Sequence, residues 1–483
     1  MKFSTSVAGF ALAALVHAKP EHERMTYLPE MGNFDTYGAF SGYLPIEGTS
    51  KQIHYLFFEA QENAEDAPVL IWFNGGPGCS SMLGFMQENG PFRLESGSTK
   101  FHPDQYSWNR ETNLLYIEQP AGVGYSYCEG TRDCTFTDHT SGQDNLTVLL
   151  EWYNKFPEFK DNDLFVSGES YAGIYVPYLS WYIVQHNEAN ADNDDVFKPN
   201  IKGFAVGNGV TNWTYDTNAA YLDMAYWHSM MSQEMRDQLD ALQCDWNMPY
   251  MIGVSDECMD IFNEFSNLTS QVNVYDIFGT CWGAGPYPQA EEPEEEDGKP
   301  HMYEKDEERV HQQYVTAADY TPWTHMAKSK RNPKQLSELP PCTFGSSLLT
   351  YMNSKEVRTA MNIPDYVQAW DLCTNGINYI MEPQGSQWIY EALAGKIKML
   401  HYSGDTDGAV PAVGTQNWIA TLGWNVTDEW KQYYVQGQVA GYHESYEGGL
   451  TFGTVHGAGH MAPQFKPPQT YHLVFNWMFD REI

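Results

Sequence analysis

The strongest candidate for a reactive side chain is a serine in a short string of mostly small residues. The string GESYA, residues 168–172, follows the apolar run 164–166 after one further serine, Ser167. Small residues around a serine let the chain turn sharply from a strand into a helix and hold the hydroxyl above the sheet edge. The usual pattern is G-x-S-x-G, and Ala172 at its last position still leaves room for the turn. We therefore predict that Ser170 is a nucleophile for acyl transfer.

A serine nucleophile needs a histidine base, and the base needs an acid that orients it. Where a serine sits on such a turn, the acid and then the histidine follow it along the chain. Asp407 comes after the apolar run 397–402, and His460 lies near the C-terminus. Asp405 is the alternative acid, although an aspartate at the end of a strand is also typical of a turn. The predicted catalytic residues are Ser170, Asp407 and His460.

A metal site is the competing interpretation of the histidines. His456 and His460 are four residues apart, as in metal sites built on one helix face. Gly457 and Gly459 disfavour that helix. We therefore expect no metal ion and no cofactor.

Acyl transfer also needs backbone N–H groups that stabilise an oxyanion. The turn NGGPGC, residues 74–79, follows the apolar run 68–73, where this type of fold places such a donor. The N–H groups of Gly76 and Tyr171 are the predicted pair. The alternative is a glycine-rich turn without a catalytic role.

These groups must be held by a rigid scaffold, and the chain contains a series of apolar runs typical of buried strands. The runs are residues 41–44, 54–58, 68–73, 114–117, 163–166, 203–206 and 397–402. Helical patterns, such as the one over residues 142–156, lie between them. Apolar strands that alternate with helices predict an α/β fold, with a central, mostly parallel sheet covered by helices on both faces.

Residues 211–341 break this rhythm, because they are rich in Trp, Tyr, Met and Asn and contain no run typical of a buried parallel strand. We predict that they form an inserted cap region between two parts of the core, residues 19–210 and 342–483. The insertion includes the strongly acidic stretch 291–308, which we interpret as a solvated surface loop. The alternative is an electrostatic guide for cationic substrate side chains.

Residues 1–18 have the pattern of a signal peptide. Lys2 precedes the apolar run 7–16, and small residues at positions 16 and 18 fit a cleavage site. The run is too short to span a membrane, and the alternative is a buried N-terminal helix. We predict a secreted protein, with a vacuolar or lysosomal location as the alternative.

Secretion fits the even number of eight cysteines and four N-x-S/T sequons. The predicted glycosylation sites are Asn145, Asn212, Asn267 and Asn425. The formal net charge of −36 disfavours nucleic acid and anionic membranes as partners. The oligomeric state cannot be predicted from these features.

Taken together, these strings resemble the serine carboxypeptidase family, which are peptidases with the α/β-hydrolase fold. The matching strings, in family order, are FSGYL, HYLFFEAQ, WFNGGPGCSSM, ENGPF, NLLYIEQPAGVGYSY, GESYAGIYVP, GNGVT, YSGDTDGAVP and GAGHMAP. They cover nearly the whole mature chain, and only the insertion matches poorly. Within the family, the sequence is most similar to the secreted fungal enzymes. The resemblance implies hydrolysis of the C-terminal bond of peptides and proteins through an acyl-enzyme.

The resemblance also implies a binding site for the free carboxylate of the substrate. Its residues would be Asn74, Gly75, Glu88 and Glu169. Two ionised glutamates would repel a carboxylate, so the groups must share protons through hydrogen bonds between acid and carboxylate. We therefore expect the enzyme to favour acidic pH, with a KM that rises as the pH rises.

Cysteine spacing alone leaves the disulfide pairing open. The resemblance implies the pairs Cys79–Cys373, Cys244–Cys258 and Cys281–Cys342. Cys128 and Cys134 are then left to close a short loop.

Two other functions compete with peptide hydrolysis. An acyltransferase on the same scaffold would keep the catalytic residues but alter the carboxylate site, and the presence of Glu88 and Glu169 disfavours it. A non-catalytic binding protein with the same fold is the second alternative. It is disfavoured because no catalytic residue and no oxyanion glycine is missing.

Overall fold

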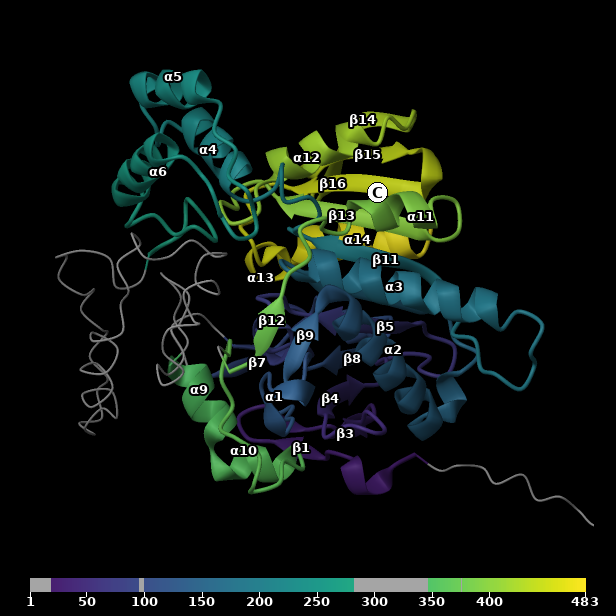
Figure 1. Cartoon of the computed structure of the whole chain (residues 1–483). Helices are drawn as coiled ribbons and strands as arrows, with labels where there is room; N and C mark the ends of the chain where they lie inside the picture. The colour runs from purple at the N-terminus through teal and green to yellow at the C-terminus, as the bar shows by residue number, and fades with distance from the viewer. Residues whose placement is uncertain (1–18, 95–99, 282–345, 375) are drawn as a thin grey trace, which may run out of the picture.

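The computed structural model describes residues 19–94, 100–281, 346–374 and 376–483. The predicted signal peptide and the acidic stretch 291–308 lie outside these ranges. The core is a ten-stranded sheet with the strand order β14-β15-β16-β13-β11-β10-β5-β8-β4-β3 (Figure 1). Its strands are β3 (Ala39–Pro45), β4 (Gln52–Phe58), β5 (Val69–Phe73), β8 (Asn113–Ile117), β10 (Leu164–Glu169), β11 (Ile201–Gly207), β13 (Lys398–Gly404), β14 (Val426–Val435), β15 (Gln438–Tyr446) and β16 (Leu450–Val455).

Helices and short strands surround this sheet. The helices are α1 (Gly130–Asp133), α2 (Asp138–Lys155), α3 (Ala172–Ala189), α4 (Asn218–Trp227), α5 (Gln233–Leu242), α6 (Asp256–Leu268), α9 (Ser346–Asn353), α10 (Lys355–Ala360), α11 (Gln387–Leu393), α12 (Ala412–Thr421), α13 (Ala462–Phe465) and α14 (Pro467–Met478). The short strands are β1 (Tyr27–Leu28), β2 (Gly32–Asn33), β6 (Phe92–Leu94), β7 (Phe101–Pro103), β9 (Thr135–Thr137) and β12 (Asn378–Ile380).

The middle of the sheet is parallel and its edges are antiparallel. Strands β8, β5, β10, β11, β13 and β16 pair in parallel. The antiparallel strands β4 and β3 extend one edge, and β15 and β14 extend the other. This arrangement confirms the predicted mostly parallel sheet.

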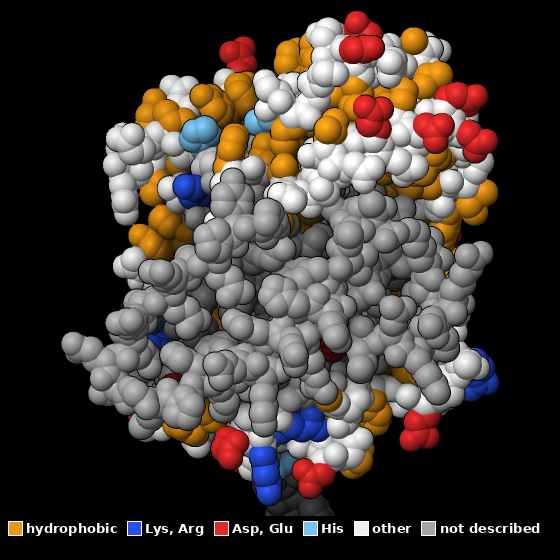
Figure 2. Space-filling view, turned by 90° about the vertical axis from the view of Figure 1, so that its left-hand side faces the viewer, with side chains coloured by type: hydrophobic (Ala, Val, Ile, Leu, Met, Phe, Trp, Pro, Cys, Tyr) orange, Lys and Arg blue, Asp and Glu red, His pale blue; other side chains and the backbone are white. Residues whose placement is uncertain are grey.

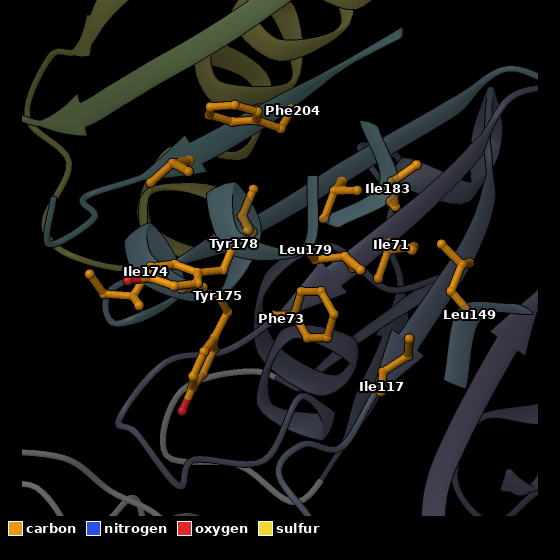
Figure 3. Close-up of a cluster of buried hydrophobic side chains, with 14 of the residues drawn as sticks. Ile71, Phe73, Ile117, Leu149, Ile174, Tyr175, Tyr178, Leu179, Ile183 and Phe204 are labelled. Atoms are coloured by element: carbon orange, nitrogen blue, oxygen red, sulfur yellow. The ribbon is translucent and has the colours of Figure 1, made fainter. Parts of the chain in front are cut away.

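Both faces of the sheet are buried, because successive side chains along a strand point to opposite faces. In β5, Ile71 and Phe73 belong to one hydrophobic cluster, and Leu70 and Trp72 belong to the other. Helices α2, α3 and α11 contribute to the first cluster, and α9, α10 and α14 contribute to the second. Figure 3 shows part of the first cluster, where Leu179 of α3 lies beside the strand residues. Helices therefore cover both faces, as predicted.

Helix α2 begins four residues before the predicted start at residue 142. Thr137 accounts for the earlier start, because its hydroxyl accepts a hydrogen bond from the N–H of Thr140 at 3.2 Å. The hydroxyl of Thr140 in turn accepts one from the N–H of Thr137 at 2.8 Å. This reciprocal capping satisfies two N–H groups at the helix terminus.

Three strands at one end of the sheet, β14, β15 and β16, were not predicted from the sequence. Most side chains of β14 are exposed, so its sequence lacks the apolar character of a buried strand. Strand β16 is fully buried, but Gly453 and two threonines interrupt its apolar residues.

Helices α4, α5 and α6 lie within the predicted insertion and form a cluster beside the sheet (Figure 1). They share a small hydrophobic core of their own, which includes Met235, Trp246 and Phe262. On the face of the molecule that carries them, acidic and hydrophobic side chains are interspersed over the upper part (Figure 2). Among the helices that the structure describes, none is long and apolar enough to cross a bilayer.

The packing of α3 on the sheet predicts the cost of a cavity. Replacement of the fully buried Leu179 by alanine should lower the free energy of unfolding by about 2–5 kcal/mol. Gln185→Ala, at an exposed position of the same helix, should change it by about 0.5 kcal/mol or less. Urea denaturation of both variants measures the difference, and equal values would contradict this description of the core.

Candidate active site

Ser170 lies on a sharp turn between β10 and α3. Its φ angle is 65°, a left-handed conformation that non-glycine residues seldom adopt. Backbone hydrogen bonds hold this conformation: the Ser170 N–H donates to Gly207 O at 3.0 Å, and its carbonyl accepts from Gly173 N at 2.9 Å and Val210 N at 3.0 Å. A strained serine between a strand and a helix is the geometry of a nucleophile elbow.

Small residues are required beside this turn because the backbone is crowded. A Cβ atom on Gly168 would lie 2.5 Å from Phe73 O, and one on Gly173 would lie 2.2 Å from Val210 O. The same Cβ on Gly168 would approach the Cβ of Ala172 to 2.7 Å. The small residues of the string therefore serve close packing between β10, β5 and α3.

Asp407 and His460 form a buried pair at the ends of the adjacent strands β13 and β16. His460 Nδ1 lies 2.7 Å from Asp407 Oδ2. The carboxylate also accepts hydrogen bonds from the N–H groups of Ala409, at 2.7 Å, and Val410, at 3.1 Å. Within the described part of the chain, His460 Nε2 is buried and has no hydrogen-bond partner. This nitrogen is therefore available to receive a proton from a serine hydroxyl.

Asn208 is a further residue of this pair that the sequence analysis missed. Its Nδ2 donates to Asp407 Oδ2 at 2.9 Å, while its Oδ1 accepts from Gly404 N at 2.9 Å. Its own N–H donates to Tyr402 O at 2.8 Å. A polar side chain two residues after the apolar run 203–206 was the available signal, since strand ends carry functional groups in parallel sheets.

Asp405, the alternative acid, has a different partner. Its Oδ2 lies 2.7 Å from Nδ1 of His456, whose side chain is 65% exposed, and its Oδ1 accepts from Gly457 N at 2.6 Å. His456 therefore pairs with Asp405 at the surface and does not share the partner of His460. Among the described residues, no group of histidine, cysteine and acidic side chains could hold a metal ion.

The amide of Asn74 joins two buried glutamates. Its Nδ2 donates to Glu88 Oε1 at 2.8 Å and to Glu169 Oε1 at 3.0 Å. Its Oδ1 accepts from Trp72 Nε1 at 2.9 Å and from Gly84 N at 2.9 Å. These two donors fix the orientation of the amide, so its NH₂ group must face the carboxyl groups.

The two carboxyl groups cannot both be ionised without a large cost. Burial raises the pKa of Glu169 well above its usual range, and the neighbouring Glu88 carboxylate raises it further. Burial also raises the pKa of Glu88, although hydrogen bonds with Glu169 and Asn74 oppose this shift. The Oε2 atom of each group is buried and receives no hydrogen bond from an N–H group. The pair therefore holds a proton and can bind a ligand carboxylate.

The glycine-rich turn, residues 74–79, packs directly against the nucleophile elbow. A Cβ atom on Gly75 would lie 2.3 Å from Tyr171 N and 2.8 Å from Ser170 Cβ. Gly76 and Gly78 have φ angles of 114° and 109°, which only glycine adopts readily. The two predicted oxyanion donors, Gly76 and Tyr171, thus belong to segments in contact.

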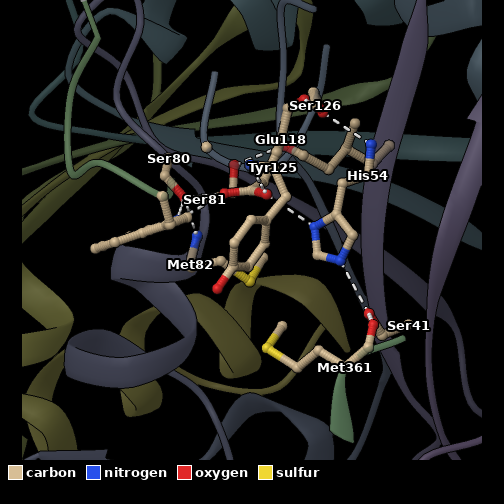
Figure 4. A network of polar contacts seen from close by, with 12 residues as sticks. Ser41, His54, Ser80, Ser81, Met82, Glu118, Tyr125, Ser126 and Met361 are labelled. Atoms are coloured by element: carbon tan, nitrogen blue, oxygen red, sulfur yellow. Dashed lines mark hydrogen bonds and ion pairs between the residues drawn. The ribbon is translucent and has the colours of Figure 1, made fainter. Parts of the chain in front are cut away.

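A buried polar network supports the glycine-rich turn, residues 74–79, through the adjacent Ser80 (Figure 4). The hydroxyl of Ser80 donates to Glu118, which also accepts from Tyr125 N at 2.9 Å and pairs with His54 Nδ1 at 2.8 Å. Trp370 Nε1 donates to Ser80 Oγ at 2.9 Å. Glu118 and His54 could not be identified from the sequence, because their roles depend on contacts between distant segments.

One disulfide lies in the same region. The structure contains the bonds Cys79–Cys373, Cys128–Cys134 and Cys244–Cys258. The first lies next to the backbone hydrogen bond from Ser80 N to Leu372 O, at 2.8 Å. Cys281 is also disulfide-bonded, but Cys342 lies outside the described residues, so their pairing stays a prediction.

One predicted glycosylation site needs correction. Asn145 lies within α2 and is only 1% exposed, so no glycan can be attached to its amide in this fold. The sequon was misleading because its asparagine lies on the buried face of α2, whereas its threonine, Thr147, is only partly buried. Asn267 and Asn425 are exposed, and Asn212 is partly exposed.

Comparison with known proteins gives a consistent result. The model of the serine carboxypeptidase family matches residues 29–480. Serine carboxypeptidase 1 of Hordeum vulgare is 31% identical over 479 residues, which cover 95% of this chain and 93% of that protein. The lysosomal protective protein of Mus musculus is 31% identical over 475 residues, covering 94% of this chain and 93% of that protein.

A solved structure supports the fold. The crystal structure of Kex1Δp, a prohormone-processing carboxypeptidase from Saccharomyces cerevisiae, matches with a TM-score of 0.70 and 20% sequence identity. The match covers 96% of this chain and 97% of that chain, so the chain has the α/β-hydrolase fold. The family match over residues 29–480 and the similarity to serine carboxypeptidase 1 show that the protein is an enzyme with serine carboxypeptidase activity. On these grounds, the chain belongs to the serine carboxypeptidase family.

Proposed function

We propose that the enzyme removes C-terminal residues through an acyl-enzyme on Ser170, with His460 as the base and Asp407 as the acid that orients it. One observation carries this proposal: the buried carboxyl pair is covalently next to the nucleophile, because Glu169 directly precedes Ser170. A group that binds a free carboxylate at that position selects the last peptide bond of a chain. Internal peptide bonds offer no carboxylate there.

The chemical steps follow from the positions of these groups. Ser170 Oγ attacks the carbonyl carbon of the scissile bond, and its proton moves to His460 Nε2. The N–H groups of Gly76 and Tyr171 stabilise the resulting oxyanion. The C–N bond then breaks, and His460 gives the proton to the leaving amine. Water, activated by His460, cleaves the ester bond to Ser170 and restores the enzyme.

The carboxylate of the leaving residue is held by Asn74, Gly75, Glu88 and Glu169. Protonated Glu169 donates a hydrogen bond to the substrate carboxylate, and the Asn74 amide keeps the two glutamates in place. Acyl transfer to another acceptor is the alternative activity. The carboxyl pair favours hydrolysis of peptides, because an acyltransferase would not need to recognise a free carboxylate.

We also infer where the protein works and how its chain is divided. The signal pattern of residues 1–18 and the exposed sequons at Asn267 and Asn425 support secretion, with a vacuolar or lysosomal location as the alternative. The similarity to secreted fungal enzymes rests on the sequence strings. Residues 211–341 would form a cap between core parts 19–210 and 342–483. Their loops would select substrate side chains, and peptide and protein C-termini are the expected partners.

Release of the C-terminal amino acid from an N-blocked dipeptide at about pH 5, where carboxyl pairs still share protons, tests the proposed function. The wild-type enzyme should release it, and Ser170→Ala should not. The C-terminally amidated dipeptide should react far more slowly, because it lacks the carboxylate. Equal rates for the acid and the amide would contradict the assignment of the carboxylate site.

The pKa shifts predict how KM depends on pH. Glu169 keeps its proton below its raised pKa and binds the substrate carboxylate there. As the pH rises through that pKa, the second negative charge appears, and KM should increase about tenfold for each pH unit above that pKa. In Glu169→Gln only Glu88 of the pair can still ionise, so KM should rise less steeply between about pH 4 and about pH 8 than in the wild type.

An N-blocked amino acid methyl ester serves as the control for this measurement, since it has no free carboxylate. Its KM should be independent of pH in both proteins. The same pH dependence for ester and dipeptide would show that the effect does not come from carboxylate recognition.

Two neighbouring aspartates allow a matched test of the catalytic acid. Asp407→Asn should lower kcat about 10⁴-fold, because the amide no longer holds His460 in the reactive tautomer. Asp405→Asn should leave kcat within about twofold, because its contact with the exposed side chain of His456 contributes little. Steady-state hydrolysis of the blocked dipeptide measures both, and a larger loss for Asp405→Asn would reverse the assignment.

A further inference from the structure

A short segment after α6 lies directly against both catalytic loops. It comprises residues 273–277 and is called the strap here. Its polypeptide belongs to the predicted insertion, whereas the loops it contacts belong to the core. One of these loops carries Asp407, and the other carries His460.

On the aspartate side, the strap and the loop exchange three hydrogen bonds. Gly408 N donates to Val274 O at 2.8 Å, and Ile277 N donates to Thr406 O at 3.0 Å. The hydroxyl of Thr406 donates to Asp276 Oδ1 at 2.9 Å. The residues on both sides of Asp407 are therefore tied to the strap.

On the histidine side, Tyr275 contacts His460 in two ways. The N–H of His460 donates to Tyr275 O at 2.6 Å. The ring of Tyr275 also packs on the imidazole, with 5.1 Å between ring centroids and 52° between planes. This contact restricts both the backbone and the ring of His460.

Glycines in the two loops make this close approach possible. A Cβ atom on Gly459 would lie 2.2 Å from Tyr275 O, and one on Gly408 would lie 2.9 Å from Val274 O. The loops thus lack side chains where the strap passes. The glycines beside Asp407 and His460 are explained by this contact with the insertion.

The strap has internal bonds of its own. Tyr275 N donates to Asn273 Oδ1 at 3.1 Å, and Asp276 N donates to Asn273 O at 3.1 Å. Asn273 is buried, and its Nδ2 donates to Thr280 O at 3.2 Å. The segment is therefore a structured turn that can hold the two loops in a fixed position.

We propose that the strap is a positioning element for catalysis, in which Tyr275 holds His460 in the orientation that accepts the proton of Ser170. The insertion then contributes to the chemical step as well as to substrate selection. This inference rests on the proposed role of His460 as the base. Tyr275 acts through His460 and is a positioning residue.

The test separates positioning of His460 from substrate binding. Purified full-length variants are compared in two assays: hydrolysis of the blocked dipeptide, and the rate constant of inactivation by a small sulfonyl fluoride. The reagent forms an S–O bond to Ser170 with loss of fluoride, and this reaction needs the base but no binding of a leaving residue. Tyr275→Ala should lower kcat and the inactivation rate constant together by about 10- to 100-fold, with KM nearly unchanged.

Two variants serve as controls. Tyr275→Phe keeps the ring and the backbone contact, so both rates should stay within about twofold of wild type. Phe278→Ala removes a ring just outside the strap that is 74% exposed, and it should leave both rates unchanged. An unchanged inactivation rate in Tyr275→Ala, together with a raised KM, would overturn the proposal, because Tyr275 would then only contact substrate.

If Tyr275→Ala does not fold, Asp276→Ala gives the answer, since it removes the hydrogen bond to Thr406. It should lower the inactivation rate constant, and a wild-type value would overturn the proposal. His460→Ala tests the proposed function separately. If that variant still reacts at the wild-type rate, His460 is not the base, whatever the strap does.

Discussion

The contact between the glycine-rich turn and the nucleophile elbow is the constraint on which the site depends. Strands β5 and β10 are parallel neighbours in a register that pairs Trp72 with Ser167 and Phe73 with Gly168. Both strands end at the same level, so the turn after β5 meets the turn after β10. With no side chain at Gly75, the two backbones can touch. The proposed oxyanion donors, carboxylate site and nucleophile then lie close together, although they come from segments about a hundred residues apart in the chain.

The same geometry brings together the two residues of the proposed acid–base pair. Strands β13 and β16 are parallel neighbours that end at Gly404 and Val455, and the loops after them carry Asp407 and His460. Strand β11 pairs with β13 on its other side and supplies Asn208 to the Asp407 carboxylate. The proposed catalytic groups thus emerge from the carboxyl ends of neighbouring strands. Burial makes their hydrogen bonds strong and leaves few alternative arrangements.

The sequence predicted most of the sheet, because apolar runs ending in glycine or serine mark buried parallel strands. It could not predict β14, whose exposed side chains have no apolar pattern, or the interrupted strand β16. The string GESYA and the order of aspartate and histidine indicated the proposed catalytic residues. Asn208, Glu118 and Tyr275 escaped prediction, since their importance comes from partners far away in the chain. Asn145 was wrongly predicted as a glycosylation site for a related reason: a three-residue motif does not show which face of a helix is buried.

The buried carboxyl pair has a consequence for the stability of the whole fold. A glutamate in the unfolded chain releases its proton near pH 4.3, whereas Glu169 in the folded protein holds it to a much higher pH. Folding therefore takes up a proton between these two values. This contribution to stability is complete below the unfolded pKa and is lost as the pH rises through the folded one. Acidic pH thus favours the native state through the same side chains that would recognise the substrate. A rise in pH would therefore lower the stability of the fold and the affinity for substrate together.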